Sequence, residues 1–358
     1  MKLILIAIII SLFFSFAYSE ETGKSDFFVL PLALYTSETS LAFGGLIYYS
    51  NRPAGRAYLL SPDAHYINGI YSLNKQVQIL YRSEFYLHRE KYFLSPEIDY
   101  EKWPGKFFGI GNNTKSSSEE KYTNDYHALR LRARYNINDK FAAGIIAEYE
   151  NFEISEMETD GMLITNEISG SEKFNLNNLG MIFYYDTRDI TTYSTRGEYF
   201  IFELKRSDSM FGSDYDYTSY RMDLRKFIPL SLKSALALQG ILSHIDSQAP
   251  FQRLTKLGHH MRGFETNRYI DNSLMMLRAE YRIFPWQIPG LDRLGFVVFA
   301  ESGQVAPDLG SFKLNETKLS IGGGLRLSVI PAEKLNLRFD FGLSKDMLEI
   351  QIMSYEVF

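Results

Sequence analysis

The residues that could perform catalysis are few in this chain. It contains no cysteine, which excludes disulfides, thiolate nucleophiles and zinc–thiolate sites. Hydrolases need a nucleophile, a base and an orienting group, and none of the six histidines lies in a recognisable nucleophile motif. The adjacent His259 and His260 come nearest to a metal site, but neighbouring side chains on an extended chain point apart, and two imidazoles do not make a site. We therefore expect no enzymatic activity, no metal site and no cofactor.

Charged side chains at alternate positions offer a second kind of chemistry. Arg130, Arg132 and Arg134 fall on one face of an extended segment whose other face is apolar. If the arginine face lines a pore, the row is a path for anions. The row can equally pair with inward-facing acids and fill the interior with fixed charge. Candidate acids are Glu148, Glu150 and Asp223.

The elements that would position these side chains are β-strands. Apolar and polar residues alternate through most of the chain, and helical periodicity is scarce. One example sets Leu335, Leu337, Phe339 and Phe341 against Asn336, Arg338 and Asp340. Apolar and polar residues also alternate in a soluble sheet with one solvent-exposed face, but this chain has no separate set of strands that would form a buried core. Its 15% aromatic content and mean hydropathy of −0.18 fit a transmembrane barrel, in which only alternate residues face lipid.

The N-terminal residues indicate the cellular compartment of the protein. Lys2 is followed by an apolar run to Ala17, and Ala17-Tyr18-Ser19 has the small residues that signal peptidase reads. We expect a signal peptide over residues 1–19, cleaved before Glu20, and an outer-membrane barrel over 20–358. The apolar run is too short for a spanning helix, which needs about 20 apolar residues. The formal net charge of −5 argues against a nucleic-acid partner.

Sixteen candidate strands follow from the alternation. They lie near residues 26–35, 39–51, 55–67, 75–87, 91–101, 122–135, 140–154, 172–186, 196–206, 215–227, 233–245, 273–284, 292–304, 316–328, 334–344 and 347–357. Connections after even-numbered strands are mostly short, whereas those after the fifth, seventh and eleventh are long. This asymmetry is typical of barrels with short periplasmic turns and long outer loops. The predicted fold is an all-β, transmembrane antiparallel barrel.

Several motifs, in order, resemble the BamA/TamA family, also called the bacterial surface antigen family. Residues 257–264, Leu-Gly-His-His-Met-Arg-Gly-Phe, are similar to the signature of its long loop. Residues 186–189 and 195–197 resemble its periplasmic turn, and 280–282 and 295–305 resemble the two strands after the loop. Phe358 is similar to the C-terminal aromatic residue that assembly machinery recognises. The ordered set covers most of residues 100–358.

The resemblance implies that this extracellular loop folds back into the barrel lumen. Mapped residue by residue, it sets Arg262 against Glu280 and Glu301, where the family normally has aspartate at the second position. The alternation of both strands also points these two glutamates inward. A confined guanidinium needs acceptors for its five donors, and carboxylates accept them in bidentate geometry. Gly263 would permit a tight approach, and Phe264 would pack beneath the loop.

The resemblance implies an assembly or transport role with one departure. Family members that insert proteins carry periplasmic POTRA domains, whereas only residues 20–25 separate the signal from the first strand here. We expect a barrel of the bacterial outer membrane that assists protein assembly or translocation without such domains of its own. A passive or anion-preferring pore and a structural surface-antigen barrel are the alternatives. Expected partners are outer-membrane lipid, lipopolysaccharide and the barrel-assembly machinery, and the resemblance also allows periplasmic or lipoprotein partners.

Overall fold

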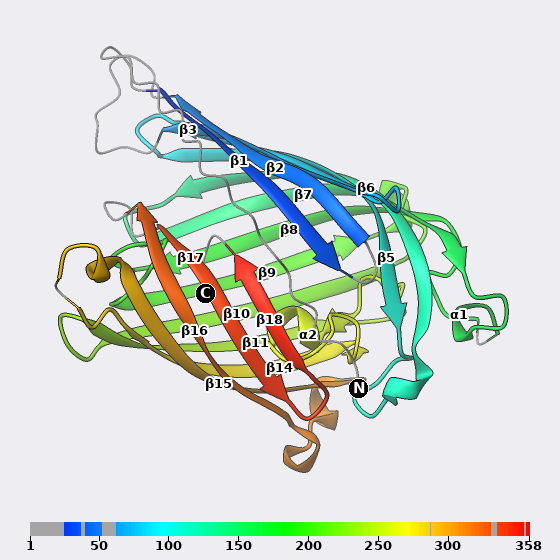
Figure 1. Cartoon of the computed structure of the whole chain (residues 1–358). Helices are drawn as coiled ribbons and strands as arrows, with labels where there is room; N and C mark the ends of the chain where they lie inside the picture. Colours follow the sequence, from blue (N-terminus) through cyan, green and yellow to red (C-terminus); the bar gives the residue numbers. More distant parts are fainter. Residues whose placement is uncertain are drawn as a thin grey trace.

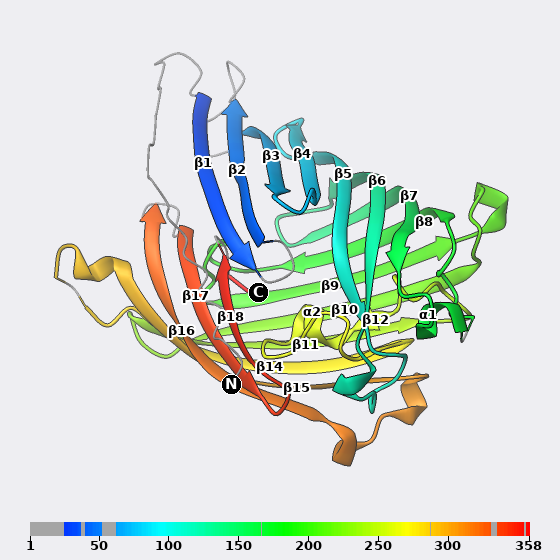
Figure 2. The same cartoon turned by 45° about the vertical axis from the view of Figure 1, so that its right-hand side comes forward.

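The computed structural model describes residues 25–36, 40–51, 62–165, 167–286, 288–330, 335–353 and 356–358. Within these ranges, sixteen antiparallel strands pair in chain order in one sheet, with β1 and β18 at its two ends. The sheet curves around an interior that holds a loop with the short helix α2 (Figures 1 and 2). The predicted signal peptide, residues 1–19, lies outside the described residues. No helix of the described part is long and apolar enough to cross a membrane.

The strands carry the labels of Figure 1. They are β1 (Ser25–Thr36), β2 (Ser40–Asn51), β3 (Asp63–Ser72), β4 (Val77–Leu87), β5 (Tyr92–Phe107), β6 (Glu120–Asn136), β7 (Phe141–Met157), β8 (Phe174–Asp186), β9 (Gly197–Ser207), β10 (Tyr217–Pro229), β11 (Ser234–Ile245), β14 (Ser273–Ile283), β15 (Leu294–Ala306), β16 (Lys318–Ile330), β17 (Leu335–Ser344) and β18 (Leu348–Met353). Two helices, α1 (Met162–Thr165) and α2 (Leu257–His260), and the two-residue strands β12 (Thr255–Lys256) and β13 (Ile270–Asp271) lie in the loops.

The two faces of the sheet reverse the arrangement of a soluble protein. On β14 the outward side chain of Leu277 is 59% exposed, whereas its inward neighbour Arg278 is 4% exposed. On β17 the same contrast holds between Phe341 and the fully buried Asp340. Alternate residues therefore put an apolar belt outside and charged groups inside. This is the arrangement of a barrel whose outer surface meets lipid, as the sequence predicted.

Connection lengths divide the barrel into two ends. The long connections are residues 108–119, 158–173, 246–272 and 307–317, and all follow odd positions in the strand order. Short turns such as 88–91, 137–140 and 230–233 lie at the other end. We assign the end with the long loops to the extracellular side and the end with the short turns to the periplasm.

Three predicted strands differ from the structure by more than three residues at one or both ends. The third was expected over 55–67, but β3 runs from Asp63 to Ser72, and residues 55–61 lie outside the described part. Asn68 and Gly69 suit a tight turn, yet they stay extended because β2 and β4 pair with them on both sides. The fifth strand is longer than predicted and ends at Phe107. The last strand ends at Met353 rather than 357.

The extracellular half of the lumen holds a hydrophobic cluster. Buried aromatic residues from β5 to β8 and β10 meet Ala249, Phe251 and Leu254 of the connection between β11 and β14. Phe251 packs against the rings of Phe107 and Tyr122 at centroid distances of 5.1 and 5.5 Å. The inward face of β6 therefore changes along its length. It is apolar near the extracellular end and carries the arginine row nearer the periplasmic end.

Candidate functional site

The connection between β11 and β14, residues 246–272, is here called the lumen loop. Its two arms pair as β12 and β13, with Thr255 opposite Asp271 and Lys256 opposite Ile270. The helical turn α2 lies between the arms and is followed by Met261 and Arg262. Figure 2 shows α2 inside the ring of strands. His259 and His260 belong to this helical turn, with ring centroids 5.0 Å apart, so the assumption of an extended chain there was wrong.

Arg262 is held by three carboxylates on three strands. Its Nε donates to Glu301 on β15 at 2.8 Å and its Nη2 to Glu280 on β14 at 3.0 Å. Its Nη1 donates to Asp340 on β17 at 2.6 Å, and its backbone N–H reaches Glu301 at 2.7 Å. The guanidinium carbon lies 3.2 Å from the centroid of the Phe299 ring, and Arg262 is 2% exposed. The structure thus brings together the predicted Arg262, Glu280 and Glu301.

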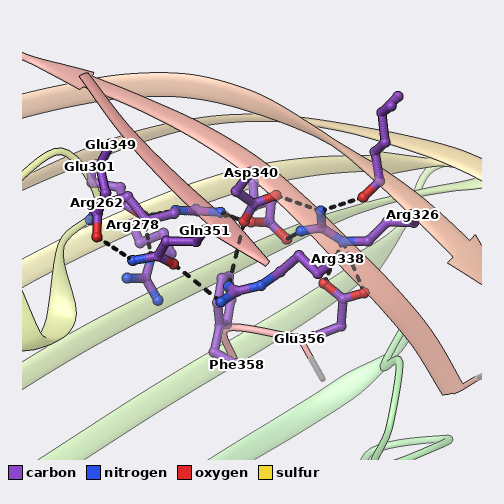
Figure 3. A network of polar contacts seen from close by, with 12 residues as sticks. Arg262, Arg278, Glu301, Arg326, Arg338, Asp340, Glu349, Gln351, Glu356 and Phe358 are labelled. Atoms are coloured by element: carbon purple, nitrogen blue, oxygen red, sulfur yellow. Dashed lines mark hydrogen bonds and ion pairs between the residues drawn. The ribbon is translucent and has the colours of Figure 1, made fainter. Parts of the chain in front are cut away.

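Each carboxylate also binds a second arginine. Arg282 donates to Glu280 at 2.7 Å, and Arg278 donates to Glu301 at 2.7 Å. Arg326 donates to Asp340 at 2.5 Å. Figure 3 shows the part of this arrangement around Asp340, with Arg262 and Arg326 approaching it from opposite sides. We call Arg262, Arg278, Arg282, Arg326, Glu280, Glu301 and Asp340 the arginine network.

Gly263 and Phe264 complete the contact between loop and wall. Gly263 has a φ of +86°, a left-handed conformation that glycine adopts without the steric cost of a side chain. Its N–H donates to Glu349 at 2.6 Å, and its carbonyl accepts from Ser344 at 2.6 Å. Phe264 is 3% exposed and packs edge-on against Tyr269 of the same loop. The tip of the loop is therefore fixed to β17 and β18 through its backbone.

A second arginine of the lumen loop contacts the opposite wall. Arg253 lies 3.1 Å from Glu150 on β7, and its guanidinium lies over the rings of Tyr126 and Phe152. The loop consequently joins two groups of strands across the lumen, β6 and β7 through Arg253 and β14, β15 and β17 through Arg262. Arg253 could not be predicted from the sequence, since no motif distinguishes it from a solvated loop arginine.

Two arginines of the β6 row, Arg130 and Arg134, have partners rather than open space. Arg130 donates to Glu97 at 2.6 Å, and ion pairs join it to Asp99 and Glu150. Arg134 lies over the rings of Phe93 and Tyr184. Arg132 is exposed on the same face. Of the acids suggested from sequence, Glu150 binds Arg130, Glu148 binds Lys205, and Asp223 binds Arg225.

Phe358 lies inside the barrel. After β18 ends at Met353, residues 356–358 turn inward, and Phe358 is 6% exposed. Its ring stacks on Phe227 of β10, and the guanidinium of Arg282 lies 4.8 Å from the ring centroid. The segment leaves the sheet because its charged and aromatic side chains meet partners in the lumen. An assembly signal at Phe358 would have to be read before the chain reaches this state.

The turn between β8 and β9, residues 187–196, lies at the periplasmic end. The Asp189 carboxylate accepts hydrogen bonds from the backbone N–H groups of Ile190, Thr195 and Arg196 and from the Thr195 hydroxyl. Burial raises the pKa of Asp189, but these hydrogen bonds outweigh it and hold the pKa below its ordinary value. The Ser194 carbonyl accepts from Arg282, which connects this turn to the arginine network.

The site as a whole immobilises a loop. Its buried cations and anions alternate and pair with one another, which is the chemistry of a structural clamp rather than of proton transfer or nucleophilic attack. Sequence reasoning missed Asp340, Arg278, Arg282 and Arg326. All four occupy polar positions of alternating strands, so the pattern placed them inside the barrel but could not show which of them meet.

Comparisons with known proteins agree with this geometry. The model of the Omp85 superfamily domain matches residues 60–347. BamA from Haemophilus ducreyi lacking POTRA domains 1–3 is similar in structure, with a TM-score of 0.61 and 16% identity over 93% of this chain and 69% of that chain. CdiB from Escherichia coli gives a TM-score of 0.61 and 12% identity over 95% of this chain.

The chain spans 62% of that CdiB structure and 64% of CdiB from Acinetobacter baumannii, which it matches with a TM-score of 0.54 and 12% identity. At these identities the structural likeness concerns the fold. No curated protein matches the sequence. The family match covers most of the chain, and the strand order, the apolar belt and the loop inside the lumen agree with it. This chain belongs to the Omp85 superfamily and is a BamA-type barrel of the bacterial outer membrane.

Proposed function

We propose that this barrel assists the assembly of other proteins into the outer membrane or their translocation across it, with a lumen that the lumen loop keeps closed. The proposed role requires no catalytic step. Outer-membrane lipid and lipopolysaccharide would surround the barrel, and the assembly machinery would act during its biogenesis. Periplasmic or lipoprotein partners would bind at the periplasmic end.

The buried clamp on Arg262 is the observation that carries the proposal. Three charge-assisted hydrogen bonds join its side chain to Glu280, Glu301 and Asp340. Removing one partner of such a buried charge pair costs about 3–5 kcal/mol. A loop held so firmly suits a barrel that does not conduct small solutes at rest.

The unequal lengths of the outermost strands suggest where the barrel would act. The sheet begins with β1, which has 12 residues, and ends with β18, which has 6. The described part of β18 is therefore long enough to pair with only part of β1. Backbone groups without a partner in a bilayer cost several kcal/mol each, so the surrounding lipid would be perturbed there. We place the assembly activity at this seam, where a client strand could find hydrogen-bonding partners.

A passive or anion-preferring pore is less well supported. Arg130, which would head the anion path, is bonded to Glu97 and lies within ion-pair distance of two further acids. Its charge is therefore compensated. A purely structural surface-antigen barrel would need neither the seam nor the clamp.

The test is a strain that lacks this protein. Its outer-membrane proteome should lose a subset of other barrels or surface proteins, and the native gene should restore them. Arg262→Ala should restore them poorly, because the lumen loop is released. Arg206→Ala is the matched control, since it removes an arginine whose partner Asp208 lies on the partly exposed rim. An unchanged proteome in the deletion strain would rule the assembly role out.

A further inference from the structure

Residues 356–358, here called the terminal segment, occupy a pocket at the periplasmic end of the lumen. The N–H at Nε of Arg326 donates a bifurcated hydrogen bond to the two oxygens of the Glu356 carboxylate, at 2.8 and 3.0 Å. Asn336 on β17 donates to the same carboxylate at 3.3 Å. Figure 3 shows the Glu356 carboxylate turned toward the Arg326 guanidinium. An acidic side chain is thus recognised by a buried arginine and an amide.

The aromatic end of the terminal segment has a separate set of contacts. The rings of Phe358 and Phe227 stack at 6.0 Å with an interplanar angle of 26°. Arg278 and Arg282 lie over the Phe358 ring, at 5.2 and 4.8 Å from its centroid. Arg282 also donates to the Phe358 main-chain carbonyl at 3.0 Å. Ring stacking, cation–π contacts and one backbone hydrogen bond together select an aromatic residue.

The pocket has hydrogen-bonding capacity that the terminal segment does not use. Among the described residues, Nη2 of Arg326, Nε and Nη1 of Arg338 and Oδ1 of Asn336 are buried without a hydrogen-bond partner. Nη2 of Arg326 and Nη1 of Arg338 lie within ion-pair distance of Glu280 and Asp340, at 3.9 and 3.4 Å. A longer or differently placed peptide could supply an additional acceptor to the two arginines.

These contacts make the pocket a peptide-recognition site. We propose that it binds peptide segments with an acidic residue two positions before a phenylalanine, and that the protein's own residues 356–358 fill it in the resting state. The wall comes from β10, β14, β16 and β17, and the ligand comes from the chain after β18. The ligand is therefore joined to its pocket through the end of that strand.

The terminal segment, as a ligand within the same chain (the cis ligand), competes with any free peptide for the pocket. This competition determines the apparent affinity of the free peptide. A short tether gives its ligand an effective concentration on the order of millimolar. A free peptide at micromolar concentration would then compete poorly with the terminal segment. Removing the terminal segment should expose the pocket to peptide from the periplasmic end.

Occupancy of the pocket is connected to the lumen loop through shared partners. Arg282 binds both the Phe358 carbonyl and Glu280, and Glu280 binds Arg262. Arg326 likewise binds Glu356 and Asp340. The pocket is proposed on these contacts alone and does not depend on a role in assembly.

Peptide binding to a variant that lacks residues 356–358 tests the proposal. The probe is a fluorescein-labelled peptide of the sequence Gln-Ile-Met-Ser-Tyr-Glu-Val-Phe, measured by anisotropy with the purified full barrel in detergent and in nanodiscs. The shortened variant should bind this probe, and the intact protein should bind it about 100-fold more weakly because of its tethered competitor. Probes with Gln for Glu or Ala for Phe should bind about tenfold more weakly. An amidated probe tests whether a terminal carboxylate matters.

A second pair of variants keeps the test decisive if the shortened barrel does not fold. The full-length double variant Glu356→Gln, Phe358→Ala weakens the cis ligand and should also admit the probe. In that background, Phe227→Ala should abolish binding, whereas Leu224→Ala on the lipid-facing side of the same strand should not. Folding is checked by heat-modifiable electrophoretic mobility. Failure of a folded variant to bind the probe, or equal binding of the Phe-to-Ala probe, would overturn the proposal.

Discussion

Release of the lumen loop by Arg262→Ala is the prediction that the structure makes most quantitatively. Removing one member of a buried ion pair costs about 3–5 kcal/mol, because the remaining charge stays buried without its partner. Here each remaining acid keeps another arginine, such as Arg282 for Glu280 and Arg278 for Glu301. We therefore expect the lower end of that range, about 3 kcal/mol. This corresponds to an increase of about 100-fold in the population with the loop released.

The absence of cysteine makes this population measurable by single-cysteine labelling. Met261 is 1% exposed in the loop, and Met210 is 80% exposed in the connection after β9. Met261→Cys should react slowly with a maleimide in the native background and about 100-fold faster with Arg262→Ala. Met210→Cys is the matched control and should react equally fast in both. Equal labelling of Met261→Cys in the two backgrounds would refute the clamp.

Three further predictions address other contacts of the loop and the periplasmic turn. Arg253→Gln should speed labelling of Leu254→Cys, because it frees the side of the loop facing β6 and β7; unchanged labelling would show that this ion pair does not hold the loop. Gly342→Ala should destabilise the docked loop, because the added Cβ would lie 2.8 Å from Cβ of Arg262; a native unfolding temperature would contradict this. The depressed pKa of Asp189 should stabilise the barrel above about pH 4, and this stability should be lost as the pH falls through the folded pKa. Thermal unfolding of the native protein and Asp189→Asn should therefore differ near neutral pH and converge in acid, and a difference independent of pH would exclude this linkage.

Much of the barrel could be predicted from sequence because each strand carries its own signal. Alternation places Asp340 and Arg338 on the inward face of β17, and both are buried there. The bounds were less predictable where local and long-range preferences disagree. Asn68 and Gly69 suit a turn by themselves, but pairing on both sides keeps them in β3.

The candidate site was predictable only in part. A motif in the lumen loop and the alternation of two strands led to Arg262, Glu280 and Glu301. Asp340 lies 78 residues after Arg262 in the chain, and its role depends on how far the loop reaches across the lumen. The sequence predicted a last strand that continues to residue 357. This was wrong because Phe358 packs against an aromatic ring and cations that come from other strands, and such contacts cannot be read from the segment itself.

Single-channel recording in planar bilayers tests most directly whether the loop closes the lumen. We expect the purified native barrel to show no large, steady conductance and Arg262→Ala to open it. Arg206→Ala should behave like the native protein. A large and steady conductance of the native barrel would contradict the closed lumen on which the proposed function depends.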